Sequence, residues 1–195
     1  MLFPTPLPDA DIHHHAGWLD HAAADALQTH LQAGIPWETH RIRMFGRWVD
    51  SPRLSCWIGD PGARYRYSGA DFLPHPWTPE LQRMRERLQD ALGAPFNSVL
   101  VNRYRSGADS MGWHSDDEPE LGENPVIASL TLGAARRFLL RRRDDPALKA
   151  AFVLGPGDLL VMAGATQRHY QHAVPKTAKV AGERINLTFR QIAAR

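Results

Sequence analysis

The sequence predicts an α+β fold dominated by a β-sandwich or jelly roll. Two observations carry this prediction. Helix-like segments fall in the first half of the chain, and short strand-like segments separated by Gly, Pro or Asp fill the second half. The chain has 195 residues, enough for one domain with a sizeable core, so a single domain over residues 1–195 is expected.

Two helices are expected before the strand-rich part. The first covers Asp20–Leu31, with the aspartate as N-cap and Gly34 just past the end. The second begins after Thr78, another good N-cap, which is followed by a proline at the first helical turn. It should run to about Leu92, where Gly93 can terminate it.

A region of mixed character, residues 37–67, comes before the strand-rich part. Residues 37–48 have strand character with interleaved arginines, whereas residues 53–67 look irregular because glycines and a proline interrupt them. Beyond residue 97, short apolar or alternating runs lie between turn residues, which is typical of strands. These runs are Ser98–Arg105, Val126–Leu132, Arg136–Arg142, Phe152–Leu154, Asp158–Met162 and Arg184–Ile192.

Bulk composition limits the classes of function. The chain has no run of about 18 or more apolar residues, so no membrane span is expected. The only cysteine, Cys56, leaves no internal disulfide and no cysteine-based zinc site, and it favours a reducing, cytoplasmic location. The net charge of +2 neither requires nor excludes a nucleic-acid partner.

The last predicted strand carries the first sign of a binding site. Polar and apolar residues alternate along it, so Arg184, Asn186, Thr188 and Arg190 point to one face. Two arginines and an amide on an inward face cost desolvation free energy unless an anion meets them. A small dicarboxylate would satisfy this face.

Two polar residues on an earlier strand fit the same anion. Asn102 and Tyr104 occupy alternate positions, so their side chains share one face. There they could hydrogen-bond a carboxylate held by the arginines. An ordinary half-buried strand would show the same pattern.

A candidate metal site starts from the triplet His114-Ser115-Asp116. A catalytic non-haem iron site needs two histidines and one carboxylate on one face of the metal. The second histidine could be His169 or His172, and spacing does not choose between them. The alternative interpretation is an exposed His–Asp pair on an acidic loop.

Five motifs occur in order along the chain. They are Asn102-Arg103-Tyr104, Gly112-Trp113-His114-Ser115-Asp116-Asp117-Glu118, Gly157-Asp158-Leu159-Leu160-Val161-Met162, Gln171-His172-Ala173-Val174-Pro175 and Arg184-x-Asn186-x-Thr188-Phe189-Arg190. Together they resemble the AlkB family of iron(II)- and 2-oxoglutarate-dependent dioxygenases. The similarity covers most of the chain from about Trp37, and ordered motifs are far more specific than His-x-Asp alone.

The resemblance implies a fold and a reaction. The fold is a double-stranded β-helix core with N-terminal helices and a nucleotide-recognition lid over residues 37–70. The reaction is the oxidative dealkylation of N-alkylated bases in DNA, with Fe(II), 2-oxoglutarate and O2. The alkyl group leaves as an aldehyde, the base is restored, and 2-oxoglutarate becomes succinate and CO2. A monomer that binds single- or double-stranded DNA, and no membrane, is expected.

The resemblance also assigns residues to ligands. It makes His114, Asp116 and His172 the catalytic iron ligands, and it selects His172 because the family places this histidine before a Val-Pro-like turn. Arg184 would bind the far carboxylate of 2-oxoglutarate, in keeping with the planar fork of an arginine. Arg190 would lie near the iron-chelating end. The residues that assist Arg184 would be Asn102, Tyr104 and Asn186.

Substrate contacts are implied in the lid and beside the iron loop. Met44–Trp48 resembles a finger whose apolar wedge, Phe45, fills the gap left by a flipped base. Tyr65 and Tyr67 match the position of aromatics that stack on that base. Glu118 matches a polar substrate contact. The alternative for Met44 and Phe45 is that they are core strand residues. For Tyr65 and Tyr67 it is a pair of surface tyrosines, and for Glu118 an exposed acidic loop.

A run of arginines in the strand-rich region could follow phosphates. Clusters of this kind commonly bind nucleic-acid backbones, although a solvated face would look the same. We expect Arg141 and Arg142 to contact the substrate. The full run is Arg136, Arg137, Arg141, Arg142 and Arg143.

The strand state of the substrate stays open at this point. Residues 115–119 resemble the AlkB subtype that favours single strands, whereas Phe45 resembles the duplex subtype. The alternative functions are an RNA demethylase of the same family and a 2-oxoglutarate oxygenase that acts on protein or a small molecule. A non-catalytic, nucleic-acid-binding jelly roll is the third.

Overall fold

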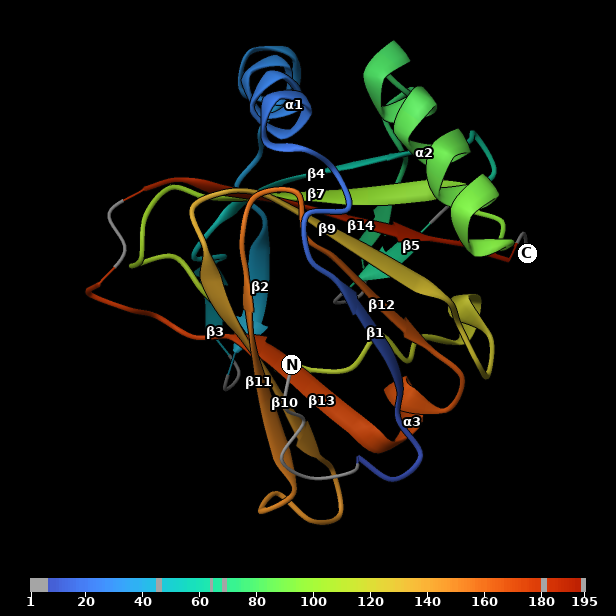
Figure 1. Ribbon diagram of the computed structural model, residues 1–195, viewed down its shortest axis with the longest axis vertical. Coiled ribbons are helices and arrows are strands. Elements are labelled where there is room, and N and C mark those ends of the chain that lie inside the picture. The colour runs from blue at the N-terminus through green and yellow to red at the C-terminus, as the bar shows by residue number, and fades with distance from the viewer. Residues whose placement is uncertain (1–6, 45–46, 64, 68–69, 180–181, 194–195) are drawn as a thin grey trace.

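The computed structural model describes residues 7–44, 47–63, 65–67, 70–179 and 182–193, with the backbone alone described within 42–48 and 65–72. Two antiparallel β-sheets pack face to face, as a jelly roll requires (Figure 1). The larger sheet has the order β1 (Asp11–His15), β12 (Leu159–Ala163), β9 (Ile127–Gly133), β14 (Arg184–Arg190), β7 (Ser98–Tyr104) and β4 (Leu54–Gly59). The smaller sheet has the order β11 (Lys149–Leu154), β10 (Arg136–Arg142), β13 (Tyr170–Val174) and β8 (Met111–His114).

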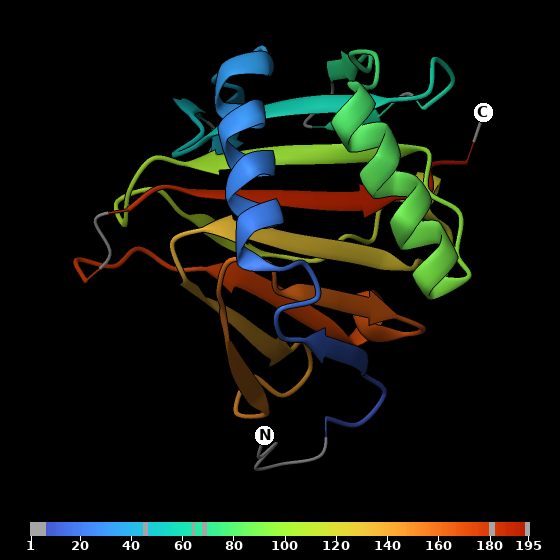
Figure 2. The same cartoon turned by 45° about the horizontal axis from the view of Figure 1, so that its top comes forward.

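Two helices cover the outer face of the larger sheet (Figure 2). In α1 (His21–Gly34), Asp20 is the N-cap, as predicted, and its side chain accepts a hydrogen bond from the Ala23 N–H. The helix continues past the predicted end to Gly34. In α2 (Pro79–Leu92), Thr78 caps the start and Gly93 ends it in the left-handed conformation with φ 61°. Both predicted helices are confirmed.

Strand β14 lies inside the larger sheet between β9 and β7, and its alternation sets the position of the site. Its apolar residues, Ile185, Leu187 and Phe189, join the core under the helices. Its polar residues face the space between the sheets. Each side of the strand therefore serves a different layer of the fold.

The sequence interpretation of residues 37–67 was right in its first part and wrong in its second. The strand character predicted for residues 37–48 is confirmed, as a hairpin of β2 (Arg41–Met44) and β3 (Arg47–Asp50). The segment read as irregular contains β4, which is buried and pairs with β7. Its apolar run is short and ends at a glycine, so the local pattern is weak. Pairing with β7 supplies the stabilisation that local propensity lacks.

Further short elements lie between these strands in the part of the chain that the structure describes. A second hairpin joins β5 (Tyr65–Tyr67) to β6 (Ala70–Phe72). A 3-10 turn, η1 (Pro119–Leu121), follows the loop after β8, and a one-turn helix, α3 (Thr166–His169), leads into β13. Among the described residues, no helix combines the length and apolar character needed to cross a membrane.

Candidate metal centre and anion pocket

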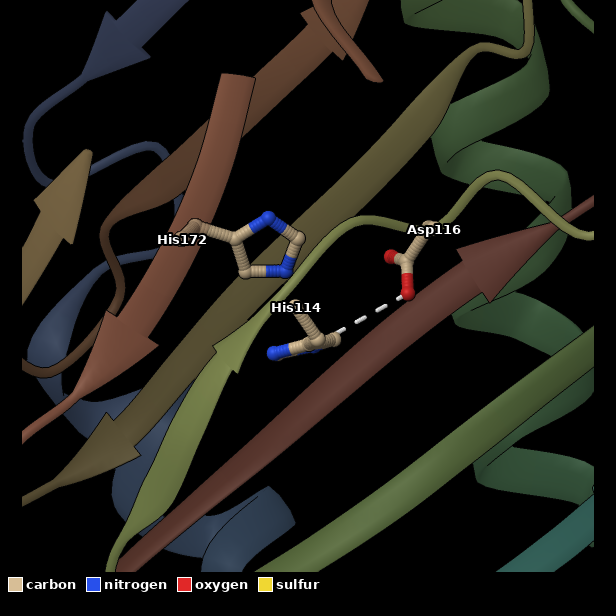
Figure 3. A group of neighbouring side chains, drawn as sticks. All are labelled: His114, Asp116 and His172. Atoms are coloured by element: carbon tan, nitrogen blue, oxygen red, sulfur yellow. Dashed lines mark ion pairs between the residues drawn. The ribbon is translucent and has the colours of Figure 1, made fainter. Parts of the chain in front are cut away.

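Three metal-ligating side chains meet between the sheets (Figure 3). His114 ends β8, and its register partner across the smaller sheet is His172 on β13. Asp116 follows in the loop after β8. The possible ligand atoms of these residues all lie within 4.8 Å of one another. The fold therefore gathers the two-histidine, one-carboxylate set that suits non-haem iron.

The register of the smaller sheet decides which histidine takes part. His172 lies opposite His114 and is buried, with its ring stacked on Phe138 at a centroid distance of 5.2 Å. His169 ends α3, and its carbonyl accepts a hydrogen bond from the Arg143 N–H. It is not part of the cluster of possible ligands among the described residues. Strand pairing thus brings His172, and not His169, against His114.

Neighbouring groups orient the cluster. The Nδ1 atom of His114 lies 2.9 Å from the Gly112 carbonyl, which leaves Nε2 for a metal. The Asp116 backbone N–H donates to the Gln167 side chain at 2.9 Å. The Asp116 carboxylate accepts a hydrogen bond from Arg190 at 2.8 Å. Such outer contacts hold metal ligands in one orientation.

Burial and charge favour the metal-binding protonation states of Asp116 and His172. Burial alone would raise the pKa of Asp116, but Arg190 and the two histidines outweigh it and lower this pKa to about 2. Burial, with His114 nearby, lowers the pKa of His172 to about 3. A carboxylate and a neutral imidazole, the forms that bind metal, therefore prevail at neutral pH.

Unpartnered atoms give a second reason to expect a bound metal ion in the cluster. Asp116 Oδ2 and His172 Nδ1 are buried, and no described residue hydrogen-bonds to either atom. Buried polar atoms without partners are costly. An ion bound at the centre of the cluster would satisfy the carboxylate oxygen.

A polar cavity extends from the metal cluster along β14 and β7. Arg184 is its most deeply buried cation, with 1% of its surface exposed. Burial lowers the pKa of Arg184 to about 10, so the guanidinium stays charged at neutral pH. No described residue accepts a hydrogen bond from its buried Nε and Nη1 atoms. The other predicted residues that line this cavity are Asn102, Tyr104, Asn186, Thr188 and Arg190.

Asn186 holds Arg184 rather than standing free for a ligand. Its carboxamide oxygen accepts hydrogen bonds from Ser129 and Arg184, and its nitrogen donates to Thr188 at 2.9 Å. Thr131 accepts a further hydrogen bond from Arg184 at 2.9 Å. The charge of Arg184 is thus fixed in place, with two nitrogens left over. This arrangement suits a carboxylate.

The predicted substrate residues are less fully described. Phe45 lies outside the described residues. Tyr65 and Tyr67 belong to β5, but their side chains lie outside the described part of the chain. Glu118 is half-buried in the loop between Asp116 and η1. These contacts stay predictions.

The arginine run divides into different environments. Arg136 is buried, and it donates to the carbonyls of residues 106, 109 and 175, so its inclusion in a phosphate-facing hairpin was wrong. Arg142 pairs with Asp9 and Asp144. By contrast, Arg141 stacks over the Trp113 ring at 4.2 Å. Strand alternation separates Arg141 from the other two, because odd and even positions of β10 face opposite sides.

Sequence reasoning missed three residues that hydrogen-bond to the candidate site residues and fix their orientation. Arg53 donates to Asn102, Gln167 accepts from the Asp116 N–H, and Thr131 accepts from Arg184. None of the three lies in a recognisable motif. A proline followed by a buried arginine, as at Arg53, carries no local signal of its partner on β7.

Comparison with known proteins agrees with this geometry. A profile of the 2OG-Fe(II) oxygenase superfamily matches residues 11–190. Human DNA oxidative demethylase ALKBH2 is 39% identical over 181 residues, which cover 88% of this chain and 69% of that protein. The chain belongs to the AlkB family of 2OG-Fe(II) oxygenases. Membership implies a dioxygenase that uses Fe(II), 2-oxoglutarate and O2.

Other AlkB-family proteins extend the comparison. Human alpha-ketoglutarate-dependent dioxygenase alkB homolog 3 is 38% identical over 187 residues, covering 91% of this chain and 65% of that protein. The chain thus matches less than two thirds of the length of that relative. A solved structure of OsALKBH1 superposes with a TM-score of 0.64 at 19% identity, over 95% of this chain and 99% of that one. This likeness supports the jelly-roll fold alone.

Proposed function

We propose that this protein removes alkyl groups oxidatively from N-alkylated bases in DNA. The observation that carries the proposal is one cavity that has the His–Asp–His cluster and the buried Arg184 in its lining. The likeness to proteins named DNA oxidative demethylase ALKBH2 supports DNA as the substrate. The reaction converts the alkylated base, O2 and 2-oxoglutarate into the restored base, an aldehyde, succinate and CO2.

In this proposal the chain supplies binding, orientation and exclusion of water. His114, Asp116 and His172 would hold Fe(II), and Arg190 would fix the carboxylate ligand. When bound together, Fe(II), 2-oxoglutarate and O2 supply an oxidant that hydroxylates the alkyl carbon. Arg184 would pair with the far carboxylate of the co-substrate and so set its direction in the cavity.

The substrate would approach from the side of the two short hairpins. Residues 37–70 form the recognition lid in this proposal, with Phe45 as the wedge that replaces a flipped base. Tyr65, Tyr67 and Glu118 would contact that base. Arg141 is the favoured phosphate contact; the carboxylates beside Arg142 make its contribution smaller. A monomer and a cytoplasmic location belong to the same proposal.

A product assay tests the proposal. Purified protein is incubated with methylated single-stranded DNA, methylated duplex DNA or methylated RNA, and formaldehyde and succinate are measured. We expect both products from DNA only when Fe(II) and 2-oxoglutarate are present, and neither from His114→Ala. Equal formaldehyde from His114→Ala would contradict the metal assignment. Turnover on RNA alone would replace DNA as the substrate.

A further inference from the structure

A short segment between the β2–β3 hairpin and β4, residues 51–53, hydrogen-bonds to three separate elements. It closes the base of the β2–β3 hairpin, reaches the residue before β8, and reaches the cavity-lining strand β7. The three hydrogen bonds are Ser51 N to the His40 carbonyl (2.8 Å), Ser110 N to the Pro52 carbonyl (3.1 Å) and Arg53 Nε to Asn102 Oδ1 (2.7 Å). Residues 51–53 thus connect the β2–β3 hairpin with β8, which carries His114, and with β7, which carries Asn102 and Tyr104.

The contact between Arg53 and Asn102 is the strongest of the three. Both side chains are buried, with 7% and 3% of their surfaces exposed. A hydrogen bond from a charged donor is shorter and stronger than a neutral one, and burial strengthens it further. Ser51 Oγ accepts from Nη1 of the same guanidinium at 3.0 Å, which fixes its plane.

This contact determines which end of the Asn102 carboxamide a ligand meets. Because Oδ1 accepts from Arg53, the amide nitrogen is the group directed to the cavity that Asn102 lines. An N–H donor suits the carboxylate or keto oxygens of 2-oxoglutarate. The reversed amide would present an oxygen to an anion, which is repulsive.

We propose that Arg53 is a positioning residue for co-substrate binding. It fixes the Asn102 amide so that its N–H donates to 2-oxoglutarate, and it acts through Asn102 rather than by touching the ligand. In agreement, the described residues that line the cavity include Asn102 but not Arg53. This inference rests on the proposed function, since it presumes 2-oxoglutarate in that cavity.

Binding measurements test this without turnover. 2-Oxoglutarate is titrated calorimetrically into the Mn(II)-loaded protein in the absence of nucleic acid. We expect Arg53→Gln to raise Kd about tenfold, as the loss of a charged, buried hydrogen bond predicts. In an Asn102→Ala background, the same substitution should change Kd less than about twofold. An unchanged Kd in the first case, or the same tenfold effect in both, would overturn the proposal.

Three controls separate the possible failures. Arg103→Gln removes a neighbouring arginine of β7 that pairs with Glu183, and it should leave Kd unchanged. Ser51→Ala replaces Arg53→Gln if the latter fails a thermal unfolding check; it should weaken binding about two- to threefold, and only when Asn102 is present. No effect of Ser51→Ala in that case overturns the proposal. A wild-type protein that binds no 2-oxoglutarate would instead contradict the proposed function.

Discussion

The Arg190 guanidinium donates a 2.8 Å hydrogen bond to the Asp116 carboxylate, and both side chains are buried. This pair connects β14, in the larger sheet, to the loop that follows β8. It occupies Oδ1 of Asp116, while no described residue hydrogen-bonds to Oδ2. The cation therefore both keeps the carboxylate ionised and sets which oxygen is available to a metal.

Removing this cation should destabilise the protein most when no metal is bound. Arg190→Met leaves a buried carboxylate without its counter-charge, which costs about 3–5 kcal/mol in comparable pairs. Urea unfolding of the metal-free protein measures the loss, and saturating Mn(II) should restore part of it. Arg83→Met, which breaks an exposed pair with Glu80, is the matched control and should have little effect. Equal losses in the two variants would contradict this account.

The stability of the metal-free protein should fall on acidification through His172. Burial lowers the folded-state pKa of this histidine from 6.5 to about 3. Between these values the unfolded chain binds a proton that the folded chain does not, so stability decreases as the pH falls from about 6.5 towards 3. Urea midpoints measured across this range should fall less steeply in His172→Gln. His13→Gln, at an exposed position, should keep the wild-type slope; an unchanged slope in His172→Gln would refute the assignment.

Arg184 should discriminate between co-substrates by their far carboxylate. Arg184→Gln is expected to weaken 2-oxoglutarate binding to the Mn(II)-loaded protein about 10- to 100-fold, as the loss of a paired, charge-assisted contact predicts. Binding of 2-oxobutyrate, which lacks the far carboxylate, should change little. Calorimetric titration of both compounds gives the comparison. If both affinities fell equally, Arg184 would not be the carboxylate partner.

The two candidate phosphate-binding arginines should differ in the salt dependence of nucleic-acid binding. Arg141→Ala should lower the slope of log Kobs against log salt by about 0.7–0.9, the value for one lost phosphate contact. Arg142→Ala should change it less, because Asp9 and Asp144 already neutralise that side chain. Fluorescence anisotropy with labelled single-stranded and duplex DNA measures the slopes. Arg83→Ala, on α2, is the control; a larger effect from Arg142 than from Arg141 would reverse our assignment.

Much of the fold follows from local signals in the sequence. The caps at Asp20 and Thr78 predicted where both helices begin, because capping depends on neighbouring residues only. Strand β4 escaped prediction, since its stability comes from pairing with β7 and from burial under the helices. Local reading fails where a non-local partner supplies the stabilisation.

The sequence by itself determined the polar face of the last strand, because alternation is a property of the extended backbone. It also contained the ordered motifs that indicate the AlkB family. Only the tertiary structure decided that His172 and not His169 meets His114, and that Arg136 is internal while Arg141 lies over Trp113. The same holds for the contact of Arg53 with Asn102. These outcomes depend on register and packing between segments far apart in the chain, which no local pattern records.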